Sequence, residues 1–147
     1  MNRIETAVSC FKQGFSCSQA ILSTFGEQFG LDRETALRLA AGFGGGMGCM
    51  AGTCGAVTGA FMVLGLKYEV TSPEDRQAKE LTYKRVREFA ARFSERNGSL
   101  ECRNLLGYDI SSPEGYQIVK DKGLISALCP KFVRDAAEIL EEMLKDG

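Results

Sequence analysis

Apolar residues recur along the chain at the three- and four-residue spacing of amphipathic helices. In the first such segment, from Arg3 to Gln13, the repeating positions are Ile4, Ala7, Val8 and Phe11. No segment alternates apolar and polar residues between hairpin turns, and no internal repeat is present. The pattern predicts an all-α fold, a compact bundle of about six or seven helices.

Capping residues and glycines set the expected boundaries of these helices. Ser16 and Asp32 are expected to cap the second and third helices, and Gly30 to end the second. Ser72 with Pro73 predicts the start of a long fifth helix. Six main helices are expected, over 3–13, 17–29, 33–40, about 53–66, 73–97 and a closing segment entered at Cys129–Pro130. A short helix is expected around Cys102, and 114–122 is a candidate for a further short one.

Two of these helices have distinctive buried faces. The fourth carries Gly55 and Gly59 four residues apart, so a neighbouring backbone is expected to approach it closely, near Cys54. The fifth is expected to bury one stripe, made of Ala78, Leu81, Val86, Phe89, Ala90 and Phe93.

Length and charge narrow the class of protein. The chain has 147 residues, of which 44% are hydrophobic, so residues 1–147 are expected to form a single domain. The 18 basic and 19 acidic residues nearly cancel and form no basic stripe, which argues against nucleic acid as a partner. The longest apolar run, Ala56 to Leu66, is too short to span a bilayer, and the N-terminus does not resemble a secretory signal. We expect a cytoplasmic protein without membrane insertion.

The chain contains six cysteines and no histidine. Without histidine, Ser-His-Asp and Cys-His catalysis, imidazole zinc sites and haem ligation by an internal histidine are excluded. In a reducing compartment, cysteines in a domain of this size are expected to be reduced, ligating or catalytic. The remaining chemistry is that of sulfur and carboxylate.

Four of the cysteines stand where the local sequence predicts the first turn of a helix. They are Cys17, Cys54, Cys102 and Cys129. Unpaired N–H groups and the helix dipole stabilise a thiolate at such a position. Cys10 lies beside Val8 and Phe11 and is expected in the core. Cys49 is either a peripheral or resolving thiol or a cysteine without a role.

A glycine-rich stretch, Gly42 to Gly48, follows the third helix. It matches neither the dinucleotide nor the P-loop pattern. Either it is a flexible turn that lets two helices pack closely, or its backbone amides face an anionic group such as a sulfur cluster. In the second case Gly45, Gly46, Gly48 and Gly55 are the candidate cofactor-binding residues.

Several of these segments together resemble a known family. The segments are Gly14-Phe-Ser-Cys-Ser-Gln-Ala20, Gly42-Phe-Gly-Gly-Gly-Met-Gly48 and Cys54-Gly-Ala-Val-Thr-Gly-Ala60, followed by Cys102 and Cys129. The chain is similar to the redox-active C_GCAxxG_C_C family, which is marked by a Cys-Gly-Ala-x-x-Gly motif and four cysteines. The resemblance implies a small bacterial or archaeal redox protein, often encoded near transporters. A similar domain in multihaem cytochromes with an iron–sulfur centre implies cluster ligation, whereas haem attachment does not carry over because Cys-x-x-Cys-His is absent.

Three functions follow from these observations. In the first, Cys17, Cys54, Cys102 and Cys129 ligate an iron–sulfur cluster or zinc. In the second, Cys54 is the nucleophile of a metal-free thiol–disulfide oxidoreductase; it ranks lower because no histidine or obvious lysine neighbour activates the thiol. The third is a non-catalytic helical interaction module. A redox or transporter-associated protein partner and a homo-oligomer are both compatible with the sequence.

Overall fold

The computed structural model describes residues 1–145 and confirms the all-α class. Within this range the only pairing of extended segments is one isolated bridge between Thr53 and Glu101. The helices are α1 (Arg3–Lys12), α2 (Cys17–Phe25), η1 (Glu27–Phe29), α3 (Arg33–Ala40), η2 (Ala41–Phe43), α4 (Gly55–Tyr68), α5 (Arg76–Asn97), α6 (Cys102–Leu106), α7 (Pro113–Lys122) and α8 (Leu124–Lys145), where η denotes a short 3-10 helix.

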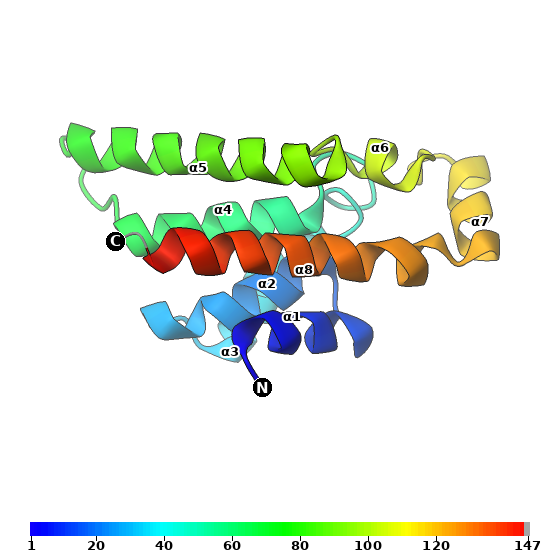
Figure 1. Ribbon diagram of the computed structural model, residues 1–147, viewed down its shortest axis with the longest axis horizontal. Coiled ribbons are helices and arrows are strands. Elements are labelled where there is room, and N and C mark those ends of the chain that lie inside the picture. Colours follow the sequence, from blue (N-terminus) through cyan, green and yellow to red (C-terminus); the bar gives the residue numbers. More distant parts are fainter. Residues whose placement is uncertain (146–147) are drawn as a thin grey trace.

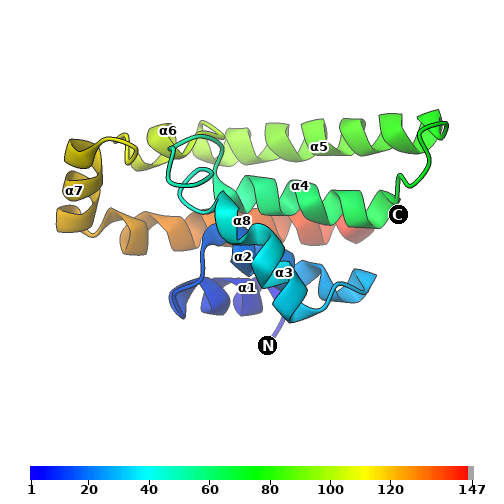
Figure 2. The ribbon, with the colours of Figure 1, turned by 180° about the vertical axis from the view of Figure 1, so that it is seen from behind.

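The long helices α4, α5 and α8 run lengthwise, and α1, α2 and α3 pack along one side of them (Figure 1). The short helices α6 and α7 lie together at one end, as the view from behind also shows (Figure 2). Buried residues from all these layers form one hydrophobic core, and its largest fully buried side chains include Phe25, Phe89 and Phe93. Burial of these apolar side chains holds the layers together.

Side-chain caps fix the starts of the helices that lead to the site. Ser16 forms a capping box with Gln19: its hydroxyl accepts from the Gln19 N–H at 3.3 Å, and its own N–H donates to the Gln19 side chain at 3.0 Å. Asp32 accepts from the Thr35 N–H at 3.1 Å. The capping box makes Cys17 the first residue of α2.

Two expected helix boundaries are wrong. The second helix ends at Phe25 with Gly26 as its C-cap, and it is followed by the short η1, after which the Leu31 N–H donates back to the Gly26 carbonyl at 3.1 Å. The fifth helix begins at Arg76 under an Asp75 cap, because the Ser72 hydroxyl donates to Glu74 at 2.7 Å and does not cap a helix. The expected buried stripe of α5 is also shorter than predicted: only Phe89 and Phe93 are buried, and Leu81 is 40% exposed.

The closing helix begins earlier than the sequence suggests. It starts at Leu124 and passes through Pro130, so Cys129 is its sixth residue and not at its entrance. Proline inside a helix removes one N–H and usually ends or kinks the helix. Here the residues around it, Cys129, Phe132 and Val133, are buried in the core, and this packing keeps the helix continuous across the proline.

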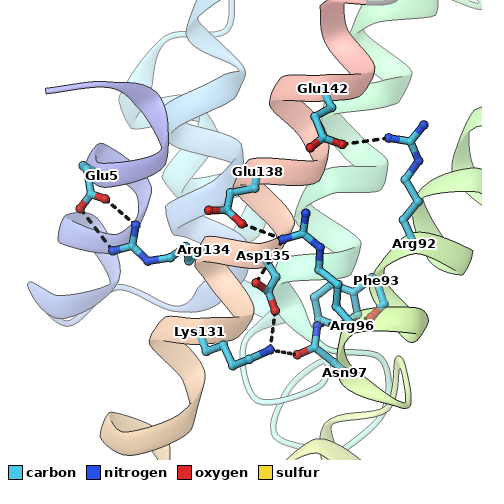
Figure 3. A network of polar contacts seen from close by, with 10 residues as sticks. All are labelled: Glu5, Arg92, Phe93, Arg96, Asn97, Lys131, Arg134, Asp135, Glu138 and Glu142. Atoms are coloured by element: carbon cyan, nitrogen blue, oxygen red, sulfur yellow. Dashed lines mark hydrogen bonds and ion pairs between the residues drawn. The ribbon is translucent and has the colours of Figure 1, made fainter.

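A network of ion pairs joins α5 to α8 (Figure 3). Asp135, 8% exposed, accepts from Arg96 at 3.3 Å and from Lys131 at 2.6 Å. Arg96 also donates to Glu138 at 2.7 Å, and these carboxylates raise the pKa of Arg96, Glu138 most strongly. At the periphery, Arg92 pairs with the exposed Glu142 at 3.2 Å.

Asp135→Ala is expected to destabilise the fold by about 1–2 kcal/mol, because it leaves two charged donors without their buried acceptor. The matched change Glu142→Ala removes an exposed pair and is expected to cost less than about 0.5 kcal/mol. Urea unfolding followed by circular dichroism measures both. Equal losses for the two variants would contradict a special role for the buried carboxylate.

No helix among the described residues is long and apolar enough to cross a membrane.

Candidate functional site

Four cysteines, Cys17, Cys54, Cys102 and Cys129, line one cavity of about 730 Å³. They come from four helices: Cys17 begins α2, Cys54 precedes α4, Cys102 begins α6 and Cys129 lies within α8. Cys54, Cys102 and Cys129 are buried, and Cys17 is half-buried. Residues more than a hundred positions apart in the sequence therefore meet at one place.

Glycines in α4 bring Cys17 next to Cys54. A Cβ atom at Gly55 would lie 2.9 Å from the Ser18 backbone nitrogen and 3.3 Å from the Cys17 Cβ. A Cβ at Gly59 would lie 3.0 Å from the Ser18 carbonyl oxygen. Only glycine permits this approach of the two backbones. The predicted close packing at the Gly-x-x-x-Gly pair is thus confirmed, and its partner is the first turn of α2.

A short backbone pairing brings Cys54 next to Cys102. The Cys54 N–H donates to the Leu100 carbonyl at 2.8 Å, and the Cys102 N–H donates to the Gly52 carbonyl at 2.6 Å. These bonds flank the bridge between Thr53 and Glu101. The segment before α4 and the segment before α6 are therefore locked together, with one cysteine at the end of each.

The glycine-rich stretch forms an ordered left-handed loop. Six of the seven residues from 45 to 51 have positive φ, and they include Met47, Cys49 and Ala51. This conformation costs about 1–2 kcal/mol for each residue that is not glycine. The Arg103 side chain holds the loop, donating to the Ala51 carbonyl at 3.1 Å and to the Met50 carbonyl at 3.2 Å. Strained backbone of this kind often accompanies a functional site.

The four candidate glycines lie in different places. Gly45, Gly46 and Gly55 line the cavity, and Gly48 lies outside it with its N–H donating to the Gly42 carbonyl at 2.8 Å. Within residues 1–145, the N–H groups of Gly45 and Gly46 make no backbone hydrogen bond. A Cβ at Gly46 would lie 2.8 Å from the Cys102 Cβ, so this glycine also touches a site cysteine.

The thiols interact strongly with one another. Donation from the Cys17 thiol lowers the pKa of Cys54; burial opposes this, and the N–H groups of Ala56 and Val57 favour it. The Cys54 sulfur makes no side-chain capping hydrogen bond to α4. Cys17 therefore lowers the pKa of Cys54 more than the N–H groups of the helix do. Interaction with Cys129, then with Cys54, raises the pKa of Cys17 well above its usual range. Cys54 therefore loses its proton before Cys17 does.

Burial makes Cys102 a much weaker acid than an ordinary cysteine. Burial raises its pKa to about 12, and the nearby Cys54, Cys129 and Cys49 add to this effect. At pH 8 only about one Cys102 in ten thousand is then a thiolate. The thiolate is the reactive form of cysteine, so Cys102 is poorly nucleophilic without a bound cation.

Alkylation of the metal-free protein by iodoacetamide at pH 8 is expected to modify Cys54 well before Cys102. The two side chains are similarly accessible, 5% and 9% exposed, so the difference reports on thiolate content. Peptide mass spectrometry over a time course gives both rates. Equal rates would show that the two thiols do not differ in acidity.

The two remaining cysteines lie outside the cavity lining. Cys10 is buried in the core, as the sequence predicts, with its sulfur 3.8 Å from the Ser23 hydroxyl. Cys49 is exposed on the left-handed loop, and its sulfur lies against Gly45, where an added Cβ would be 2.9 Å away. All six thiols are free.

Two residues at the site were not expected from the sequence. Lys12 lines the cavity, although no lysine neighbour of the cysteines was expected; it does not contribute to the lowered pKa of Cys54. Arg103 holds the loop that borders the site. The sequence offers one hint of their location, which is that each lies close to a cysteine motif. Lys12 stands just before the Gly14–Ala20 motif, and Arg103 directly after Cys102.

The donor set matches soft metals in number and type, since four thiolates satisfy zinc or an iron–sulfur cluster. The positions of the four side chains do not by themselves define a site for a metal ion. Across residues 1–145, no group of three or more histidine, cysteine, aspartate or glutamate side chains is placed to hold a metal ion. The side chains thus share a cavity without converging on one point.

This architecture defines a helical protein with a buried four-cysteine site. The chain belongs to the family described as "Putative redox-active protein (C_GCAxxG_C_C)", whose model matches residues 15–143. This result confirms the family resemblance and supports a redox function. No curated protein and no solved structure matches the chain.

Proposed function

We propose that this protein transfers electrons through an iron–sulfur cluster held by Cys17, Cys54, Cys102 and Cys129. The observation that carries the proposal is that four helices deliver these four thiols to one cavity. Four cysteines are the ligand set of common iron–sulfur clusters. The match to a redox-active family supports the same class of function.

The surroundings of the sulfurs suit an anionic cluster. The α2 and α4 helices begin at the site and direct their positive dipole ends toward it. The Gly45 and Gly46 N–H groups, free of backbone partners, are donors of the kind that surround such clusters. Bound iron, when present, supplies one-electron redox chemistry, while the chain holds the thiolates and limits the access of water.

Zinc receives less support than a cluster. A zinc ion needs its four sulfurs at about 2.3 Å from a single point. The described side chains form no such group. Ligands of a cluster bind different iron atoms and need not meet at one point, and the cavity of about 730 Å³ beside the thiols has room for the cluster.

Anaerobic purification followed by absorption spectroscopy and by iron, acid-labile sulfide and zinc analysis tests the proposal. We expect a brown protein with charge-transfer bands and matching amounts of iron and sulfide. A colourless protein free of iron after anaerobic expression and after reconstitution with iron and sulfide would overturn it.

Thiol–disulfide exchange is the second candidate, favoured by the donation of the Cys17 thiol to Cys54. The Cys54 thiolate would attack one sulfur of a disulfide substrate and release the first thiolate. Cys17 would then lose its proton and attack the Cys54 sulfur, releasing the second thiolate and leaving a Cys17–Cys54 disulfide. The substrate gains two electrons, and a dithiol reductant regenerates the protein.

Thiol counting separates the two candidates. In the metal-free protein, exchange predicts that mild oxidation with a small disulfide removes two thiols reversibly and joins Cys17 to Cys54 in the peptide map. An unchanged thiol count would reject it. Either function calls for a redox partner and a reducing, cytoplasmic setting in which the six thiols stay free.

A further inference from the structure

The cavity beside the cysteines is larger than an iron–sulfur cluster requires. At about 30 Å³ per water in the liquid, a space of 730 Å³ corresponds to roughly two dozen waters. The eight core atoms of a four-iron cluster fill only part of it. Its volume lies within the range of about 300–1,000 Å³ that is typical of pockets for small molecules.

Apolar side chains make most of the cavity wall. Six of them come from segments far apart in the sequence: Phe11, Phe15, Leu105, Ile110, Ile125 and Phe132. Phe132 is held from behind by Phe93, with 6.5 Å between the ring centroids. Ile125 is 39% exposed although it is a large aliphatic residue. A wall of this composition favours an apolar guest, which would also cover Ile125.

The polar groups of the wall are few and of one charge. Among the described residues, Lys12 is the only charged one that lines the cavity, and no carboxylate lines it. Within the same part of the chain Lys12 forms no salt bridge. It interacts with Glu5 at longer range, and the Glu5 carboxylate is itself paired with Arg134. The cavity therefore complements a guest with one negative charge.

Burial gives the orientation of such a guest. Lys12 is exposed, whereas Cys54 is 5% exposed, so the charge belongs at the mouth and the sulfurs deeper inside. We propose that the cavity binds a small apolar carboxylate, with its carboxylate at Lys12 and its apolar part against the cysteines. The bound molecule would then be the substrate of the redox centre, and this consequence alone rests on the proposed function.

Binding can be measured with two probes that differ only in charge, 2-naphthoate and the neutral 2-naphthalenemethanol. We expect saturable 1:1 binding of naphthoate by titration calorimetry, and slower alkylation of Cys54 in its presence. Lys12→Gln is expected to weaken naphthoate about fivefold, the effect of an exposed ion pair, and to leave the neutral alcohol unchanged. Lys84→Gln, a charge change at an exposed position of α5 outside this cavity, is the matched control and is expected to change neither.

Ile125→Ala provides a second variant at an exposed wall position, and it is expected to weaken both probes. The proposal is overturned if neither probe binds, if Lys12→Gln affects both probes equally, or if Lys84→Gln weakens naphthoate as much as Lys12→Gln does. The titrations are done on metal-free and on reconstituted protein. Iron and sulfide contents are measured separately, so absence of a cluster and absence of binding are distinct results.

Discussion

Cys54→Ala is expected to abolish cluster binding. Cys54 lies at the centre of the site: Cys17 donates to it, and the paired segments before α4 and α6 place it next to Cys102. Removing it leaves three thiols, one fewer than a four-cysteine cluster site needs. After anaerobic reconstitution, iron and sulfide contents and the visible absorption should fall to the level of a protein without a site.

Two other cysteines are the controls for this variant. Cys10→Ala and Cys49→Ala each remove one thiol outside the cavity lining, and both proteins are expected to keep their iron and sulfide. Cys10→Ala should be less stable, by about 1–2 kcal/mol, since the side chain is buried. If all three variants keep the cluster, or all three lose it equally, the assignment of the ligands is wrong.

Cys102→Ala distinguishes the two candidate functions. It removes a ligand of the proposed cluster but leaves the Cys17–Cys54 pair intact. Under cluster ligation the variant loses iron, as Cys54→Ala does. Under thiol exchange it still forms the Cys17–Cys54 disulfide at an undiminished rate, and only Cys54→Ala is inactive.

Gly55→Ala is the second change with a large expected effect. The added methyl group would meet the Ser18 nitrogen at 2.9 Å and the Cys17 Cβ at 3.3 Å, and backbone cannot move aside as a flexible side chain can. Overpacking of this kind costs about 1–3 kcal/mol. The clash can be relieved only if α2 moves away from α4. The variant is therefore also expected to bind less iron, and the pKa of its Cys54 should no longer be lowered by Cys17.

Gly65→Ala is the matched control on the same helix. Nothing lies within 4 Å of a Cβ at this position. Alanine in an open helical position is expected to stabilise the protein by about 0.5–1 kcal/mol. Denaturant unfolding and iron content measure both variants. Equal stability of the two proteins would show that α2 and α4 do not depend on close contact at Gly55.

Helix periodicity and caps predicted the fold because they are local. The Ser16 and Asp32 caps lie where the sequence places them. The start of α8 was wrong for the opposite reason: Pro130 is a local stop signal, and burial of Phe132 and Val133 by distant helices overrides it. The exposure of Leu81 likewise depends on which elements cover α5, and periodicity does not contain this information.

The candidate site was only partly visible in the sequence. The prediction that these cysteines stand at helix starts is correct for Cys17 and Cys102. It is nearly correct for Cys54, which directly precedes α4. Cys129 reaches the cavity from within α8. The reasoning from helix starts therefore does not explain why this cysteine lies at the site. Whether the four thiols form one redox centre stays a prediction that the variants above test.

The glycine-rich loop shows the same limit. Its glycines indicated freedom of the backbone, and both a flexible turn and an anion-facing loop were consistent with them. The ordered left-handed path includes Met47, Cys49 and Ala51, and it is held by Arg103 from a segment some fifty residues away. No local signal specifies that such residues adopt positive φ, since the support is tertiary.

The spread of the four cysteines over separate helices has a consequence for biosynthesis. Cys129 lies on α8, more than a hundred residues after Cys17, so the ribosome must release α8 before the fourth thiol can join the others. A cofactor held by all four thiols is therefore completed only once α8 has been made. Until α8 packs into place, the earlier cysteines lack this cover, and maturation depends on a cellular environment that protects reduced thiols from oxidation.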